Sequence, residues 1–298
     1  MTLQHLRHSI NTHWSSLITH GSKFHPIHQL EPLLTSHNLW PKLKQILATG
    51  SHYPLTLHVE SKCIQDLAFF HEYGNHKSAL STEGDALTHN LLSKNVKHKH
   101  AIPLPASYID SMIRLEIYQI GIAKQHTIST QGEIIDKYWA CHVHTFTRPS
   151  GASVNTHTDM MVLEPCSYSY CLHHLLHHIH FLRLQYPFTP ILISKTDLDS
   201  AYRCMHMSWE SAVTCICIIG HMAYLLLCIP FGAAAAPPKF CIASEDTCNI
   251  TNALLSDSTW GPTTTTSPLH HLLPHLILYR RYPFHVPWPS DSMWFHLC

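Results

Sequence analysis

Charged residues are scarce in this sequence, and neither sign of charge is in excess. Asp, Glu, Lys and Arg make up 13% of the 298 residues, about half of the ~25% that is usual for soluble proteins. The 19 basic and 19 acidic side chains cancel, so the formal net charge is zero. Domains that bind nucleic acid tightly on their own carry a clear basic excess, and this composition argues against such a domain.

Two other patterns are missing. The 11 cysteines are scattered and include no Cys-x-x-Cys pair. The first residues, MTLQHLRHSINTHW, lack the apolar core of a signal peptide. We therefore expect reduced thiols and an intracellular location, in the nucleus or the cytoplasm.

Histidine, by contrast, is abundant, with 30 copies spread along the chain. A nucleotide-composition bias explains this number, since Thr, Pro and Ser are abundant too. A helix is expected over CLHHLLHHIHFLRLQYP, where His173/His177 and His174/His178 are i, i+4 pairs that can share a metal ion. The HExxH motif is absent, and no Cys or carboxylate has a convincing spacing to complete a site. We favour a solvated face, and a His-rich metal-binding protein centred on residues 173–180 is an alternative.

One apolar stretch is long enough to cross a membrane. Residues 212–236, AVTCICIIGHMAYLLLCIPFGAAAA, contain no charged side chain. Gly220 and His221 interrupt the run, and the residues on each side are strand formers. We expect two buried strands joined by a tight turn and no membrane association, with a single span at 212–236 as the alternative.

The rest of the chain mixes helical and strand patterns. Residues 1–95 are mainly helical, with helices expected over residues 32–49, ending at Gly50, and over residues 64–73, ending near Gly74. Two strands are expected around a turn at Gln131–Gly132, in IYQIGIAKQHTIS and GEIIDKYWACHVHTF. RPSGASVN, residues 148–155, follows as a polar loop, and the overall class is α+β.

The stretch ILISKTDLDSAYRCMHM, residues 191–207, suggests chemistry. An apolar strand ends on two acids, Asp197 and Asp199, and an aromatic residue follows at Tyr202. Carboxylates at a strand end suit Mg²⁺, and phosphoryl transfer uses two such ions. Such an acid can equally cap a helix that begins near Ser200. A second stretch, LCIPFGAAAAPPKFC, predicts an apolar strand, a Pro-Phe-Gly bend and a helix that starts with small residues and two prolines.

Together, KTDLDSAYR and PFGAAAAPPKF resemble motifs A and B of retroelement (retrotransposon) reverse transcriptases. Further blocks fit in the same order: EYGNHKSAL, IGIAKQHTISTQGEIIDKYWACHVHTF and SGASVN, so the likeness spans roughly residues 20–285. The resemblance implies an α+β fold with reverse-transcriptase-like fingers and a partial palm. The expected domains are a helical N-terminal extension at 1–95, a fingers-like region at 96–160, a partial palm with motifs A and B at 161–260, and a poorly ordered Pro/Thr-rich tail at 261–298.

The resemblance also implies roles in an RNA-directed DNA polymerase, a nucleotidyltransferase that acts on an RNA/DNA template-primer and a deoxynucleoside triphosphate (dNTP). Asp197 matches the catalytic carboxylate that binds both Mg²⁺ ions, and the backbone carbonyl of Leu198 is a further ligand. Tyr202 matches the position where an aromatic ring excludes a ribose 2′-hydroxyl. Phe231 and Gly232 would lie against the incoming nucleotide and template.

Several features depart from the family. Lys137 matches a fingers lysine that meets the triphosphate, but Trp139 stands where the family has an arginine, and Cys204 ends AYRC where the family has AYRR. The Tyr-x-Asp-Asp turn of motif C does not occur after Phe231. One carboxylate cannot hold two Mg²⁺ ions against their hydration. We therefore expect a truncated, pseudogene-like copy of a transposon enzyme that is inactive alone.

Overall fold

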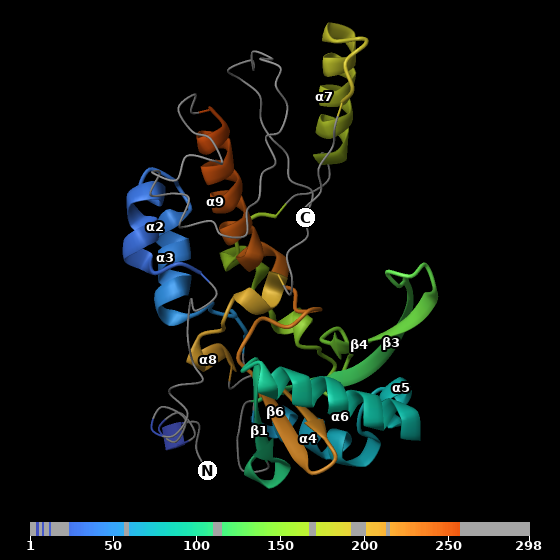
Figure 1. The fold of residues 1–298 in the computed structure, drawn as a ribbon. Coiled ribbons are helices and arrows are strands. Elements are labelled where there is room, and N and C mark those ends of the chain that lie inside the picture. The colour runs from blue at the N-terminus through green and yellow to red at the C-terminus, as the bar shows by residue number, and fades with distance from the viewer. Residues whose placement is uncertain are drawn as a thin grey trace. The chain divides into compact units, whose positions relative to one another are not determined.

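The structure is a computed structural model, and it describes residues 24–56, 60–109, 115–166, 171–191, 201–212 and 215–256, with a few isolated positions before residue 24 (Figure 1). The described residues form a mixture of helices and strands, so the α+β class is confirmed. They divide into two compact units. Unit 1 contains Met1–Phe24, Gln45–Leu163 and Ala201–Phe240, and unit 2 contains His25–Lys44, Glu164–Ser200 and Cys241–Cys298.

A four-stranded sheet forms the core of unit 1, with strand order β1-β6-β5-β2. The strands are β1 (Ala101–Pro105), β2 (Glu116–Ile117), β5 (Cys215–Ile219) and β6 (Met222–Leu226). β1 and β6 are antiparallel, as are β5 and β6, whereas β2 runs parallel to β5. The central strands are buried along nearly their whole length, which agrees with their unbroken apolar sequence.

The β5–β6 hairpin confirms the expected pair of buried strands. Ile219 pairs with Met222, so Gly220 and His221 form a two-residue turn. Gly220 has φ +55°, a conformation that glycine adopts without steric cost at the first central position of a hairpin turn. The alternative of a single span over 212–236 is wrong, because these residues reverse direction within the sheet. In the part of the chain that the structure describes, no helix is long and apolar enough to cross a membrane.

A long two-stranded ribbon also belongs to unit 1. β3 (Gln119–Ile128) and β4 (Ile134–Val143) pair antiparallel over ten residues each, and the turn lies at Gln131–Gly132 as expected. Gln119–Gly121 are buried, whereas most of the residues towards the turn are exposed. The ribbon therefore has an inner half that joins the core and an outer half that faces solvent.

Helices α4 (Glu60–Tyr73), α5 (Lys77–Leu80) and α6 (Thr82–Lys97) precede the sheet. α4 ends at Gly74, which confirms the expected boundary. The N-cap of α6 is Ser81, whose Oγ accepts a hydrogen bond of 3.0 Å from the amide of Gly84. Acidic residues occupy the first turn of α6 and lysines the last turn, which suits the helix dipole. The short elements of unit 1 are η2 (Ala106–Tyr108), η3 (Asn155–His157), η4 (Met160–Val162), η5 (Ala201–Cys204) and α8 (Trp209–Ala212).

Unit 2 contains α2 (Ile27–Leu34), the start of α3 (Trp40–Thr49), α7 (Cys171–Gln185) and most of α9 (Ala236–Ser256). The single helix expected over residues 32–49 is wrong, because turns at residues 35–39 separate α2 from α3. Pro41 follows this break in the first turn of α3, where its missing N–H costs nothing. Lys42 of α3 forms an ion pair with Glu164.

Candidate functional site

The two residues expected to bind the metal ions, Asp197 and Leu198, lie outside the described residues, as does the rest of residues 192–200. The same is true of the tail at 261–298. The other expected site residues, Tyr202, Phe231, Gly232 and Lys137, are described.

Tyr202 lies in η5 and packs between two phenylalanines. Its ring centroid is 5.7 Å from that of Phe231, with the ring planes tilted by 35°. The ring of Phe240, in the first turns of α9, meets it edge-on at 5.5 Å and 87°. Such aromatic contacts contribute about 0.5–1.5 kcal/mol beyond burial. Tyr202 is half-buried, whereas Phe231 is 71% exposed, so one face of this aromatic group is open.

The backbone explains why Tyr202 meets Phe231. The segment after Tyr202 runs antiparallel beside the segment that precedes the Pro-Phe-Gly bend, with an isolated bridge between His206 and Cys228. The amide of Met207 donates to the carbonyl of Leu227 at 2.7 Å. The amide of Ile229 donates to the carbonyl of Met205 at 3.0 Å. These bonds fix the register that brings the two aromatic residues together.

The bend after Phe231 is held by the side chain of Asn155. Its Nδ2 donates to the carbonyl of Gly232 at 3.0 Å, and its Oδ1 accepts from the amide of Ala234 at 2.8 Å. Gly232 has φ +102°. A Cβ added there would lie 2.5 Å from the carbonyl oxygen of His142. Only glycine fits this conformation and this approach.

A buried group of aromatic side chains lies next to the bend. The rings of Tyr118 and His144 stack with centroids 4.2 Å apart, and the Tyr118 hydroxyl lies 3.1 Å from Nδ1 of His142. Burial lowers the pKa of His142 to about 3, helped by the charge of Arg203, and it holds the pKa of His144 well below its usual range. Both histidines are therefore neutral at physiological pH.

Lys137 stands apart from this aromatic group. It lies in the exposed outer half of the ribbon, with its Nζ 4.2 Å from the ring centroid of Trp139. This is a cation–π contact. Trp139 also donates from Nε1 to Oε1 of Gln125 at 3.0 Å. The structure thus brings Tyr202, Phe231 and Gly232 together, whereas Lys137 lies on the ribbon and is not part of this group.

A buried ion network in unit 1 was not expected from the sequence. Arg148, at the start of the expected polar loop, lies 2.6 Å from Glu116 of β2 and 3.3 Å from Asp66 of α4, with all three side chains at most 3% exposed. His157 lies 2.9 Å from the other oxygen of Glu116. Ser150 donates to Asp66 from both its amide, at 3.2 Å, and its hydroxyl, at 3.0 Å. The network fastens the loop 148–155, and with it Asn155, to the core.

The histidines of α7 are the alternative metal-binding site that the sequence suggests. Within the described ranges, no group of three or more His, Cys, Asp or Glu residues is placed to hold a metal ion. His173 and His177 are exposed, in agreement with a solvated face. The apolar residues of α7 are covered unevenly: Leu175 and Ile179 are half-buried, but Leu176 is 53% exposed.

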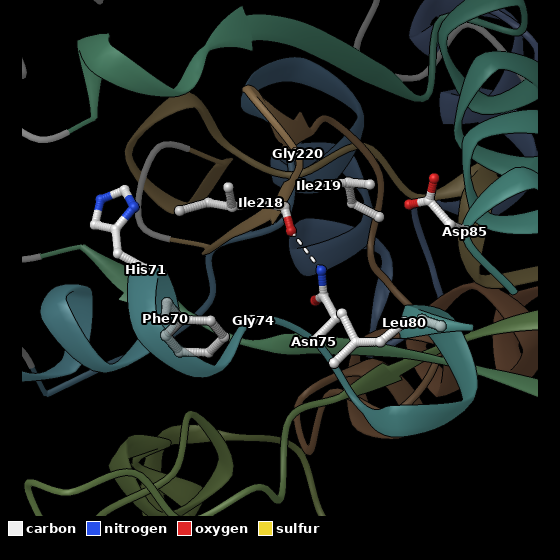
Figure 2. A pocket seen from close by; sticks show the side chains of 10 residues that line it. Phe70, His71, Gly74, Asn75, Leu80, Asp85, Ile218, Ile219 and Gly220 are labelled. Atoms are coloured by element: carbon white, nitrogen blue, oxygen red, sulfur yellow. Dashed lines mark hydrogen bonds between the residues drawn. The ribbon is translucent and has the colours of Figure 1, made fainter. Parts of the chain in front are cut away.

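A cavity of about 210 Å³ lies between the end of α4, α5, α6 and the β5–β6 turn (Figure 2). Its walls are mostly apolar, and they include Phe70 and Leu80. Asn75 reaches across it, donating from Nδ2 to the carbonyl of Ile218 at 2.6 Å (Figure 2) and accepting at Oδ1 from the amide of Ile120 at 2.8 Å. The amide of Asn75 is thus already used for structural bonds, and none of the expected site residues lines this cavity.

Comparisons with known proteins do not assign the chain to a family. No family model matches it, and neither a curated protein nor a solved structure matches it significantly.

Proposed function

We propose that this chain is related to the retroelement reverse transcriptases and contains fingers and part of the palm, and that the aromatic group around Tyr202 is the remnant of a dNTP site. The observation that carries the proposal is the ring contact of 5.7 Å between Tyr202 and Phe231. These residues come from the two sequence blocks that resemble motifs A and B. In such an enzyme both face the same nucleotide, so the resemblance requires them to be neighbours.

The surroundings of the bend add support. Asn155 comes from the SGASVN block and His142 from the block that contains the fingers lysine. Both touch the bend, Asn155 through its two hydrogen bonds and His142 through its carbonyl, which Gly232 approaches closely. Residues from four blocks of the resemblance therefore meet at one place. The exposed ring of Phe231 is free to stack on a base or to cover a sugar, because one side of it faces solvent.

Magnesium binding has less support than nucleotide binding. The ligands that the resemblance implies are Asp197 and Leu198, which the structure does not describe, and the described residues include no cluster of acids suited to the ion. No Tyr-x-Asp-Asp sequence occurs anywhere in the 298 residues. We therefore assign no step to a metal ion, and we propose that these residues alone do not polymerise DNA.

Photo-crosslinking with 5-iodo-2′-deoxyuridine triphosphate tests the nucleotide site, because iodouracil reacts with aromatic rings that stack on it. We expect crosslinks on the peptides that contain Tyr202 or Phe231. An excess of dTTP should suppress them more strongly than the same excess of UTP, since the phenol ring would exclude the 2′-hydroxyl. Replacing Tyr202 by alanine should remove the difference between dTTP and UTP.

Phe188 provides a matched control, because its ring is 97% exposed and lies outside unit 1. The Phe188→Ala variant should crosslink as the unmodified chain does. Crosslinks that are insensitive to dTTP, or that map away from Tyr202 and Phe231, would refute the nucleotide site. A primer-extension assay with Mg²⁺ and with Mn²⁺ should give no product, and template-dependent product would contradict the proposed inactivity.

A further inference from the structure

Two cysteines that are 75 residues apart in the sequence are in contact within unit 2. Cys166 follows η4 and Glu164, and Cys241 lies in the second turn of α9. Their Sγ atoms are 3.4 Å apart, about the sum of two sulfur radii. Cys241 is 7% exposed and Cys166 is half-buried. Both thiols are reduced in the structure, and their distance makes them a candidate pair for oxidation.

We propose that Cys166 and Cys241 form a reversible oxidation site that closes to a disulfide. The Sγ atoms need to approach by about 1.4 Å, from 3.4 Å to the ~2.05 Å of a disulfide bond. We expect rotation of the two cysteine side chains to supply this movement. The site would take a two-electron oxidant of the disulfide class, of which glutathione disulfide is the common cellular example. This proposal goes beyond the nucleotide site and does not depend on it.

The reaction balances in two exchange steps. The thiolate of Cys166, the more exposed of the two, attacks one sulfur of glutathione disulfide, forms a mixed disulfide and releases one glutathione thiolate. Cys241 then loses its proton and attacks Sγ of Cys166, which releases the second glutathione. Two protein thiols are oxidised, one glutathione disulfide is reduced, and the two protons end on the two glutathione molecules.

Other cysteines give an internal comparison. Cys215 and Cys217 lie in β5 and are fully buried. Burial raises the pKa of the Cys217 thiol to about 12 and that of Cys215 well above its usual range. Since the thiolate is the reactive species, both should resist oxidation while unit 1 is folded. We therefore expect the oxidant to react with Cys166 and Cys241 in preference to Cys215 and Cys217, because the first two sulfur atoms are in contact and Cys166 is accessible to solvent.

Peptide mapping under non-reducing conditions tests the proposal on the full chain. The reduced protein is dialysed against mixtures of reduced and oxidised glutathione, quenched with an alkylating agent, and cut with trypsin and Asp-N. Cys241 then lies alone in the peptide 240–245, and Cys166 lies in the peptide 159–183 together with Cys171. We expect these two peptides to be joined, with the loss of two hydrogen atoms, and to separate on adding dithiothreitol.

Variants assign the bond to one sulfur pair. The Cys166→Ser and Cys241→Ser variants should lose the joined peptide, and Cys171→Ser should keep it. Where a variant fails to fold, fragmentation of the joined peptide from the unmodified chain distinguishes Cys166 from Cys171. A bond to Cys171, disulfides only between chains on a non-reducing gel, or no bond at any glutathione ratio at which other thiols become glutathionylated would overturn the proposal.

Discussion

Replacing Arg148 by methionine isolates the contribution of the buried ion network, because methionine keeps the length of the side chain and removes its charge. The change leaves Asp66 and Glu116 as carboxylates whose side chains are 3% and 1% exposed. Breaking a buried ion pair by removing one partner costs about 3–5 kcal/mol. Ser150 still donates to Asp66, and His157 still lies beside Glu116. We therefore expect a loss near the lower end, about 3 kcal/mol of the free energy of unfolding of unit 1.

Amide hydrogen exchange in β1, β5 and β6 measures this loss, because the most protected amides of a core sheet report its global opening. Lys124→Met is the matched control: it breaks the pair between Lys124 and Asp136, whose side chains are 50% and 41% exposed. Exposed pairs contribute about 0–1 kcal/mol. The two variants lose the same kind of contact and differ in burial.

Equal protection factors in the two variants would refute the reasoning, since burial would then have no effect on the cost of a lost partner. A second replacement sharpens the test. Adding Glu116→Gln to Arg148→Met removes one stranded carboxylate, and this double variant should recover part of the lost stability. A double variant less stable than Arg148→Met would show that the uncompensated charge is not the cause.

Three further predictions concern pH and backbone conformation. Because burial lowers the pKa of His142 to about 3, the unfolded chain binds more protons than the folded chain between about pH 3 and 6.5, so stability falls as the pH drops through this window. The free energy of unfolding, measured by urea titration at several pH values, should show this slope, to which His142 contributes up to about 1.4 kcal/mol per pH unit. His142→Gln should reduce the slope. Burial, with a smaller contribution from Glu245, raises the pKa of Asp246 to about 6. The stability that its protonated form provides is thus lost as the pH rises through 6, and Asp246→Asn should raise the urea midpoint at pH 8 and leave it unchanged near pH 4. Gly232→Ala, which meets a carbonyl oxygen at 2.5 Å, should lower the thermal midpoint more than Gly132→Ala, which has φ +84° and no atom within 4 Å.

The elements that could be predicted from the sequence are those whose signals are local. Strand-forming runs on both sides of Gly220 and of Gly132 predicted the two hairpins, and both are confirmed. The helix end at Gly74 is likewise confirmed. The break between α2 and α3 was missed, although the polar run Thr-Ser-His-Asn at residues 35–38 interrupts the apolar spacing and is typical of a turn.

Features that depend on distant contacts could not be predicted in this way. Nothing in RPSGASVN indicates that Arg148 is buried, since its partners Asp66 and Glu116 come from separate elements far along the chain. The same polar composition is expected for a loop that is exposed to solvent and for a loop that is held to the core by a buried ion pair. The neighbourhood of Tyr202 and Phe231 was expected only through the family resemblance, because no periodicity links the two blocks. The position of Asp197 stays a prediction, as does the division into domains at residues 95, 160 and 260.

The outer half of the ribbon has a practical consequence for work with the purified protein. Ile128 and Ile134 face each other beside its turn and are 72% and 75% exposed. In the described chain the ribbon has only two strands, so each strand has an edge that can pair with another molecule. At high concentration, protein molecules should therefore associate through the end of the ribbon that carries Ile128 and Ile134. Replacing Ile128 and Ile134 by lysine should reduce this association before crystallisation or spectroscopy.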